Sequence, residues 1–289
     1  MRAVVLDADG LPGLAEVPDP PGSGDLVRVL ACGLCGSDVE KLGRGPVGAV
    51  LGHEVVGVLE DGSHVTVIHR VPCGSCTRCL AGHESTCEEF QQLRIDPGGF
   101  AERLRATHVV PIGGIGLDGI WIEPVACMLR ALDHVPRGRV VVVGCGAIGQ
   151  LWVQVLRRRG DEVVVADPRA DRVADAERLG ATVDDDAVDA AVVTAHDGVN
   201  TALARLEPGG TMLVFAAPAE DISFSLDAVY RRELHVVGSR SATPTHFAAA
   251  VALLPELDLP HVTTLPLERF DEGVELYRRG DALKVVFTP

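Results

Sequence analysis

The feature that most constrains the fold is a run of valines that leads straight into a glycine-rich loop. Arg139-Val-Val-Val-Val143 has the composition of a strand buried on both faces of a parallel sheet. Gly144-Cys-Gly-Ala-Ile-Gly149 follows it, and a helical pattern continues to about Arg158. A second strand pattern, Glu162–Ala166, ends in Asp167, about 20 positions further on. This succession predicts a βαβ unit, and later strand patterns extend it into a doubly wound α/β sheet.

The glycine-rich loop also predicts a dinucleotide site, because its flanking strand and helix supply the context that a bare Gly-X-Gly-X-X-Gly match lacks. The first glycine permits a tight turn, the second lets the backbone approach a pyrophosphate, and the third allows close helix–strand packing. Free N–H groups at the helix N-terminus would bind the phosphates. A glycine turn in some other α/β protein is the alternative. The candidate cofactor-binding residues are Gly144, Gly146, Ala147, Ile148, Gly149, Asp167 and Arg169.

Asp167 bears on the choice of cofactor. A carboxylate at the end of the second strand accepts hydrogen bonds from the adenosine ribose and repels a 2′-phosphate, so NAD is favoured over NADP. Arg169 argues for NADP instead, because its guanidinium could bind the 2′-phosphate.

Composition excludes several kinds of partner. The chain has 289 residues, enough for two domains, and a formal net charge of −15, which disfavours nucleic acids and anionic membranes. Its basic clusters, Arg157–Arg159 and Arg231–Arg232, sit at the edges of predicted elements, where solvated charge is ordinary. No apolar run is long enough to span a membrane, and the N-terminus does not resemble a secretory signal. We therefore expect a cytoplasmic enzyme that binds neither nucleic acids nor membranes.

Eight cysteines in such a chain favour metal binding or redox chemistry over disulfides. Four of them lie within fifteen residues, and four thiolates so close together can surround one Zn²⁺ completely, which makes a structural site. An iron–sulfur cluster is the rival interpretation, although no Cys-Pro follows the motif. The predicted ligands are Cys73, Cys76, Cys79 and Cys87, in a lobe at 72–90.

A second constellation lies upstream. Ala31-Cys-Gly-Leu-Cys-Gly-Ser-Asp38 precedes Gly52-His-Glu54, and a thiolate, an imidazole and carboxylates can hold a metal while leaving one position open. Taken alone, Cys32 and Cys35 could instead form a redox pair, and His53 could be a core histidine.

Taken together, these motifs and Glu123-Pro124 resemble the zinc-dependent medium-chain alcohol dehydrogenases, in particular the sorbitol and threonine dehydrogenase branch. The resemblance spans nearly the whole chain. It implies an α/β fold with a GroES-like β-rich catalytic domain at 1–126 and 238–289, and an inserted Rossmann NAD-binding domain, a doubly wound parallel sheet, at 127–237. It also implies two zinc ions per chain, one catalytic and one structural, and a homodimer or homotetramer.

Carried over by motif, Cys35 and His53 match zinc ligands. Glu54 matches a carboxylate that ligates zinc in the polyol branch, and Glu123 stands where classical members have a cysteine. Whether Glu54 or Glu123 completes the shell stays open, and Cys127, one helical turn beyond Glu123, is a weaker competitor. Cys32 matches no ligand and is interpreted as packing.

Two further residues are assigned by the resemblance. Ser37 matches the hydroxyl that takes the substrate proton, and Glu40 stands where many members have a histidine that relays it to solvent. The catalytic candidates are therefore Ser37, Glu40, Glu54 and Glu123.

The resemblance implies oxidation of a secondary alcohol or polyol, such as a sugar alcohol, cyclitol or amino alcohol, with transfer of hydride to NAD(P). The chain departs from the family in its short loops, with only twenty positions between His53 and Cys73. A zinc-stabilised dinucleotide-binding protein without dehydrogenase activity, or a quinone-reductase-like enzyme of the same architecture, is the alternative.

Overall fold

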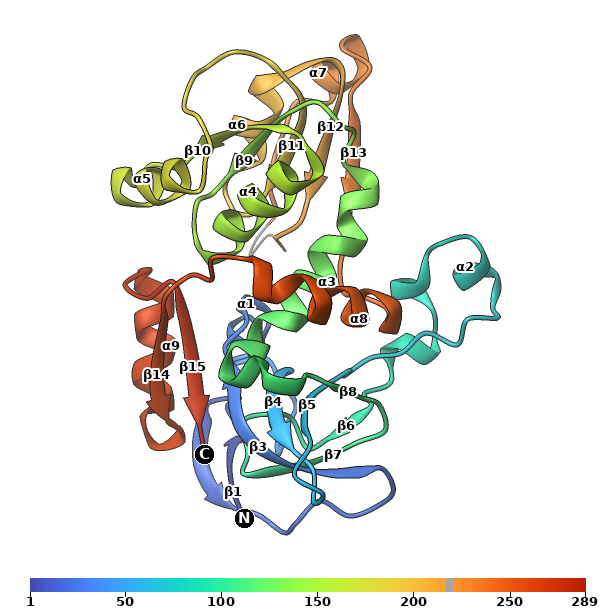
Figure 1. Ribbon diagram of the computed structural model, residues 1–289, viewed down its shortest axis with the longest axis vertical. Coiled ribbons are helices and arrows are strands. Elements are labelled where there is room, and N and C mark those ends of the chain that lie inside the picture. Colours follow the sequence, from blue (N-terminus) through green and yellow to red (C-terminus); the bar gives the residue numbers. More distant parts are fainter. Residues whose placement is uncertain (217–220) are drawn as a thin grey trace. The chain divides into compact units, whose positions relative to one another are not determined.

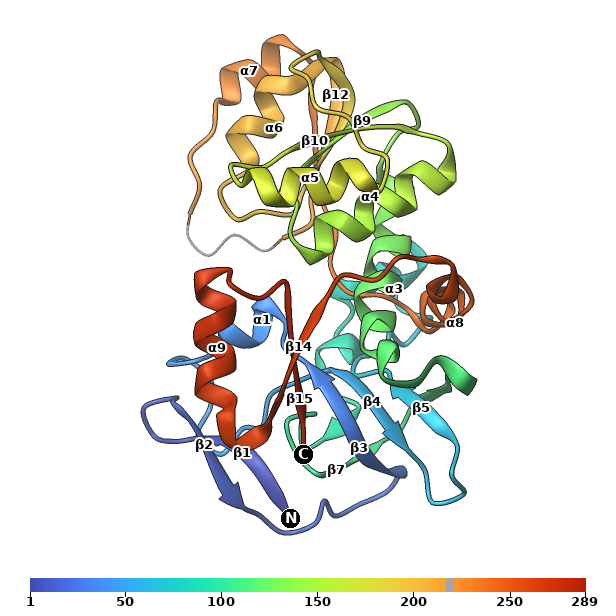
Figure 2. The same ribbon diagram turned by 60° about the vertical axis from the view of Figure 1, so that its left-hand side comes forward.

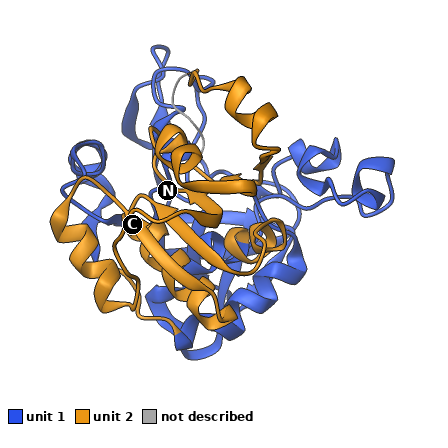
Figure 3. Cartoon of the chain, turned by 90° about the horizontal axis from the view of Figure 1, so that it is seen from above, with its two compact units in different colours: residues 1–126, 241–256, 261–289 blue, residues 127–240, 257–260 orange. Residues whose placement is uncertain are grey.

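The computed structural model describes residues 1–216 and 221–289 (Figure 1). The chain divides into two compact units, which Figure 3 colours separately. Unit 1 consists of residues 1–126, 241–256 and 261–289, and unit 2 of residues 127–240 and 257–260. The chain therefore leaves unit 1, builds most of unit 2, and returns.

Unit 1 is built on a mainly antiparallel sheet of eight strands with the order β14-β15-β3-β4-β5-β8, in which β7 also pairs with β3 and β6. The strands are β3 (Asp25–Gly33), β4 (Glu54–Val58), β5 (His64–Val67), β6 (Ile95–Asp96), β7 (Arg103–Ala106), β8 (Val109–Pro111), β14 (Val262–Pro266) and β15 (Lys284–Thr288). A separate hairpin pairs β1 (Arg2–Leu6) with β2 (Pro12–Glu16). The β-rich first domain expected from the sequence is confirmed.

The last strand of the chain completes this sheet beside the first long one. β15 pairs antiparallel with β3, with Phe287 opposite Cys32, and the opposite edge of β3 pairs with β4, with Gly33 opposite Glu54. The end of β3 and the starts of β4 and β15 therefore meet at one end of the sheet.

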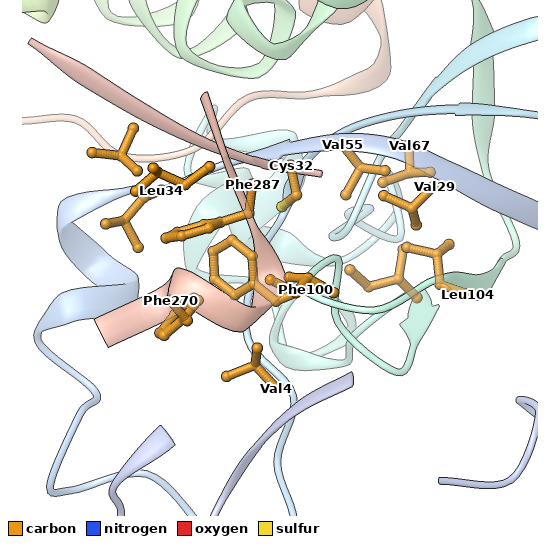
Figure 4. Packing of buried hydrophobic residues seen from close by; sticks show 14 of the residues in the cluster. Val4, Val29, Cys32, Leu34, Val55, Val67, Phe100, Leu104, Phe270 and Phe287 are labelled. Carbon is orange, nitrogen blue, oxygen red and sulfur yellow. The ribbon is translucent and has the colours of Figure 1, made fainter. Parts of the chain in front are cut away.

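The core of unit 1 lies on one face of this sheet and is rich in valine and phenylalanine (Figure 4). Phe100, Phe270 and Phe287 pack together, with ring centroids 4.6 to 5.5 Å apart. The Cys32 side chain is part of the same cluster, which confirms that this cysteine packs in the core.

Unit 1 also contains short helices. They are α1 (Gly36–Val39), α2 (Thr77–Leu80), α8 (Pro244–Leu253), α9 (Phe270–Arg279) and the start of α3 (Ile122–Ala131). A 3-10 segment, η3 (Gly113–Trp121), packs against β3, β4 and β5 and leads directly into α3.

Unit 2 is the predicted doubly wound domain. Its parallel strands follow the order β10-β9-β11-β12-β13, and α4 packs on β9 and β10 while α6 packs on β11 and β12 (Figure 2). The strands are β9 (Arg139–Val143), β10 (Glu162–Ala166), β11 (Val188–Val193), β12 (Leu206–Val214) and β13 (His235–Gly238). The helices are α4 (Ala147–Arg159), α5 (Ala170–Arg178), α6 (Val199–Arg205) and α7 (Leu226–Arg231).

One strand of the usual dinucleotide-binding order is reduced to a single bridge. Beyond β10, the described part of the sheet carries only the parallel bridge between Val164 and Thr182, fixed by two backbone hydrogen bonds of 2.9 and 3.0 Å. Counting this bridge, the order becomes the 3-2-1-4-5-6 of Rossmann folds. In folds with this strand order, ligands bind at the carboxyl ends of the strands where the order reverses. Here that position lies between the neighbouring strands β9 and β11, and the glycine-rich loop directly follows β9.

The boundaries of the two units differ from the expected domain limits at two places. Residues 238–240 cluster with unit 2 because Gly238 pairs with Val214 and the Arg130 guanidinium donates to the Arg240 carbonyl at 2.8 Å. Residues 257–260 also cluster with unit 2, because the Gln154 amide exchanges two hydrogen bonds of 2.8 Å with the backbone of Asp258.

The arginine clusters serve the fold of unit 2. Arg159 pairs with Asp161 and donates to the carbonyls of three residues before β9, and Arg232 donates to Leu203 and Leu206. Arg231 pairs with Asp227 one helical turn earlier. Within residues 1–216 and 221–289, no helix has the length and apolar character that crossing a bilayer requires.

Candidate functional site

The first candidate metal ligand, Cys35, lies directly after β3, where the chain turns into α1. Its backbone N–H donates to Asp38 Oδ2 at 3.2 Å, so the side chain of the third helical residue closes the turn. The Ser37 hydroxyl donates to Cys35 Sγ at 3.4 Å. A charged thiolate would strengthen that hydrogen bond.

His53 precedes β4 and is oriented by the same buried aspartate. Its Nδ1 lies 3.3 Å from Asp38 Oδ1, and that oxygen also accepts the Gly52 N–H at 3.3 Å. Burial opposes a charge on the ring, but Asp38 and Cys35 outweigh it and raise the pKa of His53 well above its usual value. The Asp38 contact leaves the other ring nitrogen to bind a metal, which would release the proton.

Cys35, His53 and Glu54 form a set whose ligand atoms all lie within 4.8 Å of one another. Thiolate, imidazole and carboxylate suit Zn²⁺, and three protein ligands leave a fourth position open. The donor set therefore fits a catalytic zinc.

Glu54 has a second charged partner that the sequence analysis did not identify. Its carboxylate is ion-paired with Lys284, both side chains are almost fully buried, and the ammonium lies 5.3 Å from the centre of the Trp121 ring. Burial alone would lower the pKa of Lys284, but the charges of Glu54 and Cys35 outweigh it, so this pKa is raised. Lys284 is therefore a fixed positive charge beside the metal set.

Glu123 reaches the same region from the first turn of α3. Its carboxylate, a nitrogen of His53 and a nitrogen of His69 lie within 4.8 Å of one another, and this set shares only His53 with the first. No metal-capable set among the described residues includes Cys127.

The two residues expected to move the proton occupy opposite ends of α1. Ser37 lies in its first turn against the Cys35 sulfur, whereas Glu40 caps its C-terminus and is exposed to solvent. Helix α1 thus leads from the metal set to the surface of unit 1.

The four-cysteine lobe projects from the sheet of unit 1 around α2 (Figure 1). The sulfurs of Cys73, Cys76, Cys79 and Cys87 lie within 4.8 Å of one another, with Cys73 3.6 Å from Cys87 and 3.9 Å from Cys79. Tetrahedral Zn–S bonds of about 2.3 Å require sulfurs about 3.8 Å apart. Hydrogen bonds from the backbone of Ser75 and Cys76 lower the pKa of Cys73 to about 6, which favours the thiolate that zinc requires.

The three glycines of the dinucleotide loop differ in how much space a Cβ atom would have. Gly144 has φ +102°, and a Cβ there would lie 2.7 Å from the Thr194 hydroxyl. A Cβ on Gly149 would lie 1.9 Å from the Gly144 carbonyl oxygen. A Cβ on Gly146 would meet nothing nearer than Arg172, at 3.9 Å. The fold of unit 2 therefore requires Gly144 and Gly149, while the space at Gly146 suits a ligand.

The carboxylate expected at the ribose lies beside this loop. Asp167 accepts the Cys145 N–H at 2.7 Å through Oδ2 and the Arg169 N–H at 2.9 Å through Oδ1. The Arg169 guanidinium pairs with Asp171 at 2.8 Å. The loop itself leads into α4, whose first turn contains Ala147 and Ile148.

Sequence reasoning missed Asp38, His69 and Lys284 as members of the site. Asp38 had a signal, since a carboxylate three residues after Cys35 fits a helix-capping pattern. Lys284 had one too, because a lone charge within an apolar strand needs a buried partner. His69 had none.

The alcohol dehydrogenase GroES-like domain matches residues 23–113. Sorbitol dehydrogenase of Halalkalibacterium halodurans is 30% identical, with 100% of this chain and 99% of that protein covered. D-altritol 5-dehydrogenase of Agrobacterium fabrum is 31% identical, with 83% and 84% covered. L-threonine 3-dehydrogenase of Bacillus velezensis is 28% identical, with 100% and 99% covered.

Solved structures share the fold. The alcohol dehydrogenase TADH from Thermus sp. ATN1 superposes with a TM-score of 0.84 at 24% identity, over all of both chains. A protein of Sinorhizobium meliloti 1021, described as a zinc-binding dehydrogenase and bound to NADP, has a TM-score of 0.83 at 25% identity, with 100% of this chain and 99% of that chain covered.

Proposed function

This chain belongs to the zinc-dependent medium-chain alcohol dehydrogenases, and we propose that it oxidises a secondary alcohol or polyol reversibly to the carbonyl compound with NAD. The observation that carries the proposal is the convergence of Cys35, His53 and Glu54 within 4.8 Å at one end of the unit 1 sheet. Unit 1 is then the catalytic domain and unit 2 the NAD-binding domain.

Cys35 and His53 are the proposed zinc ligands, with a carboxylate from Glu54 or Glu123 completing the protein shell. When bound, zinc supplies a Lewis acid that acidifies the substrate hydroxyl, and NAD supplies the hydride acceptor. The Asp38 carboxylate holds the His53 ring in place through Nδ1. Lys284 balances the negative charge of Glu54 in the protein interior.

Ser37 is the proposed proton acceptor. Its hydroxyl lies against Cys35 Sγ, at the edge of the proposed zinc site, where it could take the proton of a bound substrate. The proton leaves along α1 toward Glu40, whose exposed carboxylate can exchange it with water. Glu40 thereby takes the part that a histidine plays in many relatives.

Gly144, Gly146 and Gly149 with the first turn of α4 are the proposed pyrophosphate site. The open space at Gly146 and the free N–H groups around Ala147 and Ile148 support it. NAD is proposed over NADP because Asp167 is held beside the loop and the charge of Arg169 is balanced by Asp171.

A second zinc ion in the four-cysteine lobe is proposed to be structural, since four thiolates leave no position for a substrate. We also propose a homodimer or homotetramer. Strand β13 lies at the edge of the described unit 2 sheet, with mostly exposed residues, and such an edge can pair with another chain.

The proposed substrates are sugar alcohols, cyclitols and amino alcohols. The relatives named for sorbitol, D-altritol and L-threonine support the sugar alcohols and the amino alcohols. The test is NADH formation by zinc-loaded protein with a panel of polyols, amino alcohols and simple alcohols, with a chelator-treated control. Turnover on polyols that disappears with the chelator supports the proposal. Turnover on simple primary alcohols alone contradicts the substrate class.

A further inference from the structure

His69 has a backbone held by hydrogen bonds on both sides, and the proposed function gives its side chain no role. It lies two residues after β5, between the sheet of unit 1 and the four-cysteine lobe. The Ile68 N–H donates to the His108 carbonyl at 3.0 Å, and the Arg94 N–H donates to the His69 carbonyl at 2.9 Å. These bonds on either side of the residue fix where its ring can reach.

The ring reaches the metal site. Its centroid lies 4.7 Å from that of His53, and one of its nitrogens lies within 4.8 Å of the Glu123 carboxylate. His69 Nδ1 is buried and has no hydrogen-bond partner within the described part of the chain. Leaving a buried polar group unpaired costs roughly 1–3 kcal/mol. A partner that the chain does not supply would remove that cost.

A substrate hydroxyl is the partner that fits best. A metal ion is the alternative, but Cys35, His53 and Glu54 already provide a softer set, and His69 shares only the His53 neighbour with it. An imidazole nitrogen either donates or accepts a hydrogen bond, and a hydroxyl can do both, so the match holds for either tautomer.

We propose that His69 hydrogen-bonds a second hydroxyl of the substrate, adjacent to the one that is oxidised, and so selects vicinal diols over simple alcohols. The inference rests on the proposed function, because the first hydroxyl is assigned to the metal set. A simple secondary alcohol has no group to offer His69, whereas a diol satisfies both positions. Sites built to hydrogen-bond a substrate group discriminate strongly against analogues that lack it.

The test compares butane-2,3-diol with butan-2-ol, which share a carbon skeleton and differ by one hydroxyl. In His69→Phe, kcat/KM for the diol should fall by roughly tenfold or more, mainly through KM, while that for butan-2-ol stays within about threefold. His69→Asn retains an amide that can donate and accept, and should recover part of the diol activity. Zinc per chain should be unchanged in both variants.

Three results would each overturn the inference. An unchanged ratio of diol to simple-alcohol activity in His69→Phe means that the ring does not recognise the second hydroxyl. Loss of zinc with equal loss on both substrates makes His69 a metal ligand instead. If the wild type oxidises neither alcohol, the proposed function fails separately. Calorimetric binding of butane-2,3-diol to the wild type and to His69→Phe then tests the role of His69. Weaker binding to the variant supports the inference, and equal or absent binding overturns it.

Discussion

At the scale of single residues, the chemistry of the site depends on charges held in the interior. Lys284 and Glu54 lie 230 positions apart in the sequence, yet their side chains form an ion pair that is almost entirely shielded from water. Asp38 holds His53 in the same way from the start of α1. Such pairs are costly to bury and still more costly to break.

The ion pair therefore predicts the effect of removing one partner. Lys284→Met leaves the Glu54 carboxylate buried without its counter-charge and should lower the free energy of unfolding by about 3 kcal/mol. Urea denaturation of the metal-free protein measures it, because zinc bound to Glu54 would supply a second counter-charge. The double variant Glu54→Gln/Lys284→Met buries no net charge and should recover most of that loss. A single variant as stable as the wild type would contradict this interpretation.

Asp167 carries a prediction about cofactor choice. Asp167→Asn removes the charge that repels a 2′-phosphate, so the ratio of kcat/KM with NADP to that with NAD should rise by roughly tenfold, about 1.4 kcal/mol. Asp171→Asn is the matched control, since it releases Arg169 but leaves Asp167 in place, and should change the ratio less. Wild-type protein that already prefers NADP would refute the assignment.

Residues close in sequence were the predictable part of the site. The four cysteines expected to cluster lie together in the structure because they share one loop, and the motifs of Cys35 and His53 also converge. Lys284 and His69 lie near the metal set because of the strand order of the sheet, which places β15 and β5 on opposite sides of β3. No local pattern contains that information.

At the scale of elements, two glycines of the glycine-rich loop are needed for different reasons: Gly149 for the fold and Gly146 for ligand binding. Gly149→Ala should destabilise unit 2, because its Cβ would overlap the Gly144 carbonyl, whereas Gly146→Ala has room and should leave the melting temperature near that of wild type. Gly146→Ala should still weaken NADH binding by roughly tenfold, since the methyl group occupies the phosphate approach. Fluorescence titration with NADH and thermal melting measure the two effects. NADH binding unchanged by Gly146→Ala would show that the phosphates lie elsewhere.

The four-cysteine lobe has almost no core of its own. Cys79, Cys87 and Phe90 form its buried cluster, so its order should depend on zinc. Cys76→Ser should lose one zinc ion per chain and open the segment at 72–90 to limited proteolysis. Ser75→Ala, an exposed neighbour on the same loop, should retain zinc and resistance. A Cys76→Ser lobe that stays resistant would mean that zinc does not hold it.

Element limits were predicted well where the pattern was strongly apolar. The strands at 139–143 and 162–166 have the expected bounds. Strand β12 begins at Leu206 and includes Pro208-Gly-Gly210, which resembles a turn. Its pairing with β11 shifts register between Leu206 and Thr211. The short helices α6 and α7 were missed, since six or seven residues give little periodicity.

At the scale of the whole molecule, this chain is a shortened member of its family. Its alignment with the sorbitol dehydrogenase extends over 344 positions, so at least 55 of them are gaps in this 289-residue chain. The bridge at Thr182, which replaces a strand of unit 2, is one place where structure has been reduced. The metal-capable clusters and the dinucleotide loop are nevertheless present. The sequence therefore predicted the architecture through its motifs, and not through loop lengths.

The most direct test of the central claim is zinc content together with NADH formation in wild type and two cysteine variants. We predict two zinc ions per chain and turnover for wild type, and one zinc ion without turnover for Cys35→Ala. Cys32→Ala changes a core cysteine three positions earlier and should keep both zinc ions and turnover. A Cys35→Ala protein with full zinc content and full activity would contradict the assignment of this site.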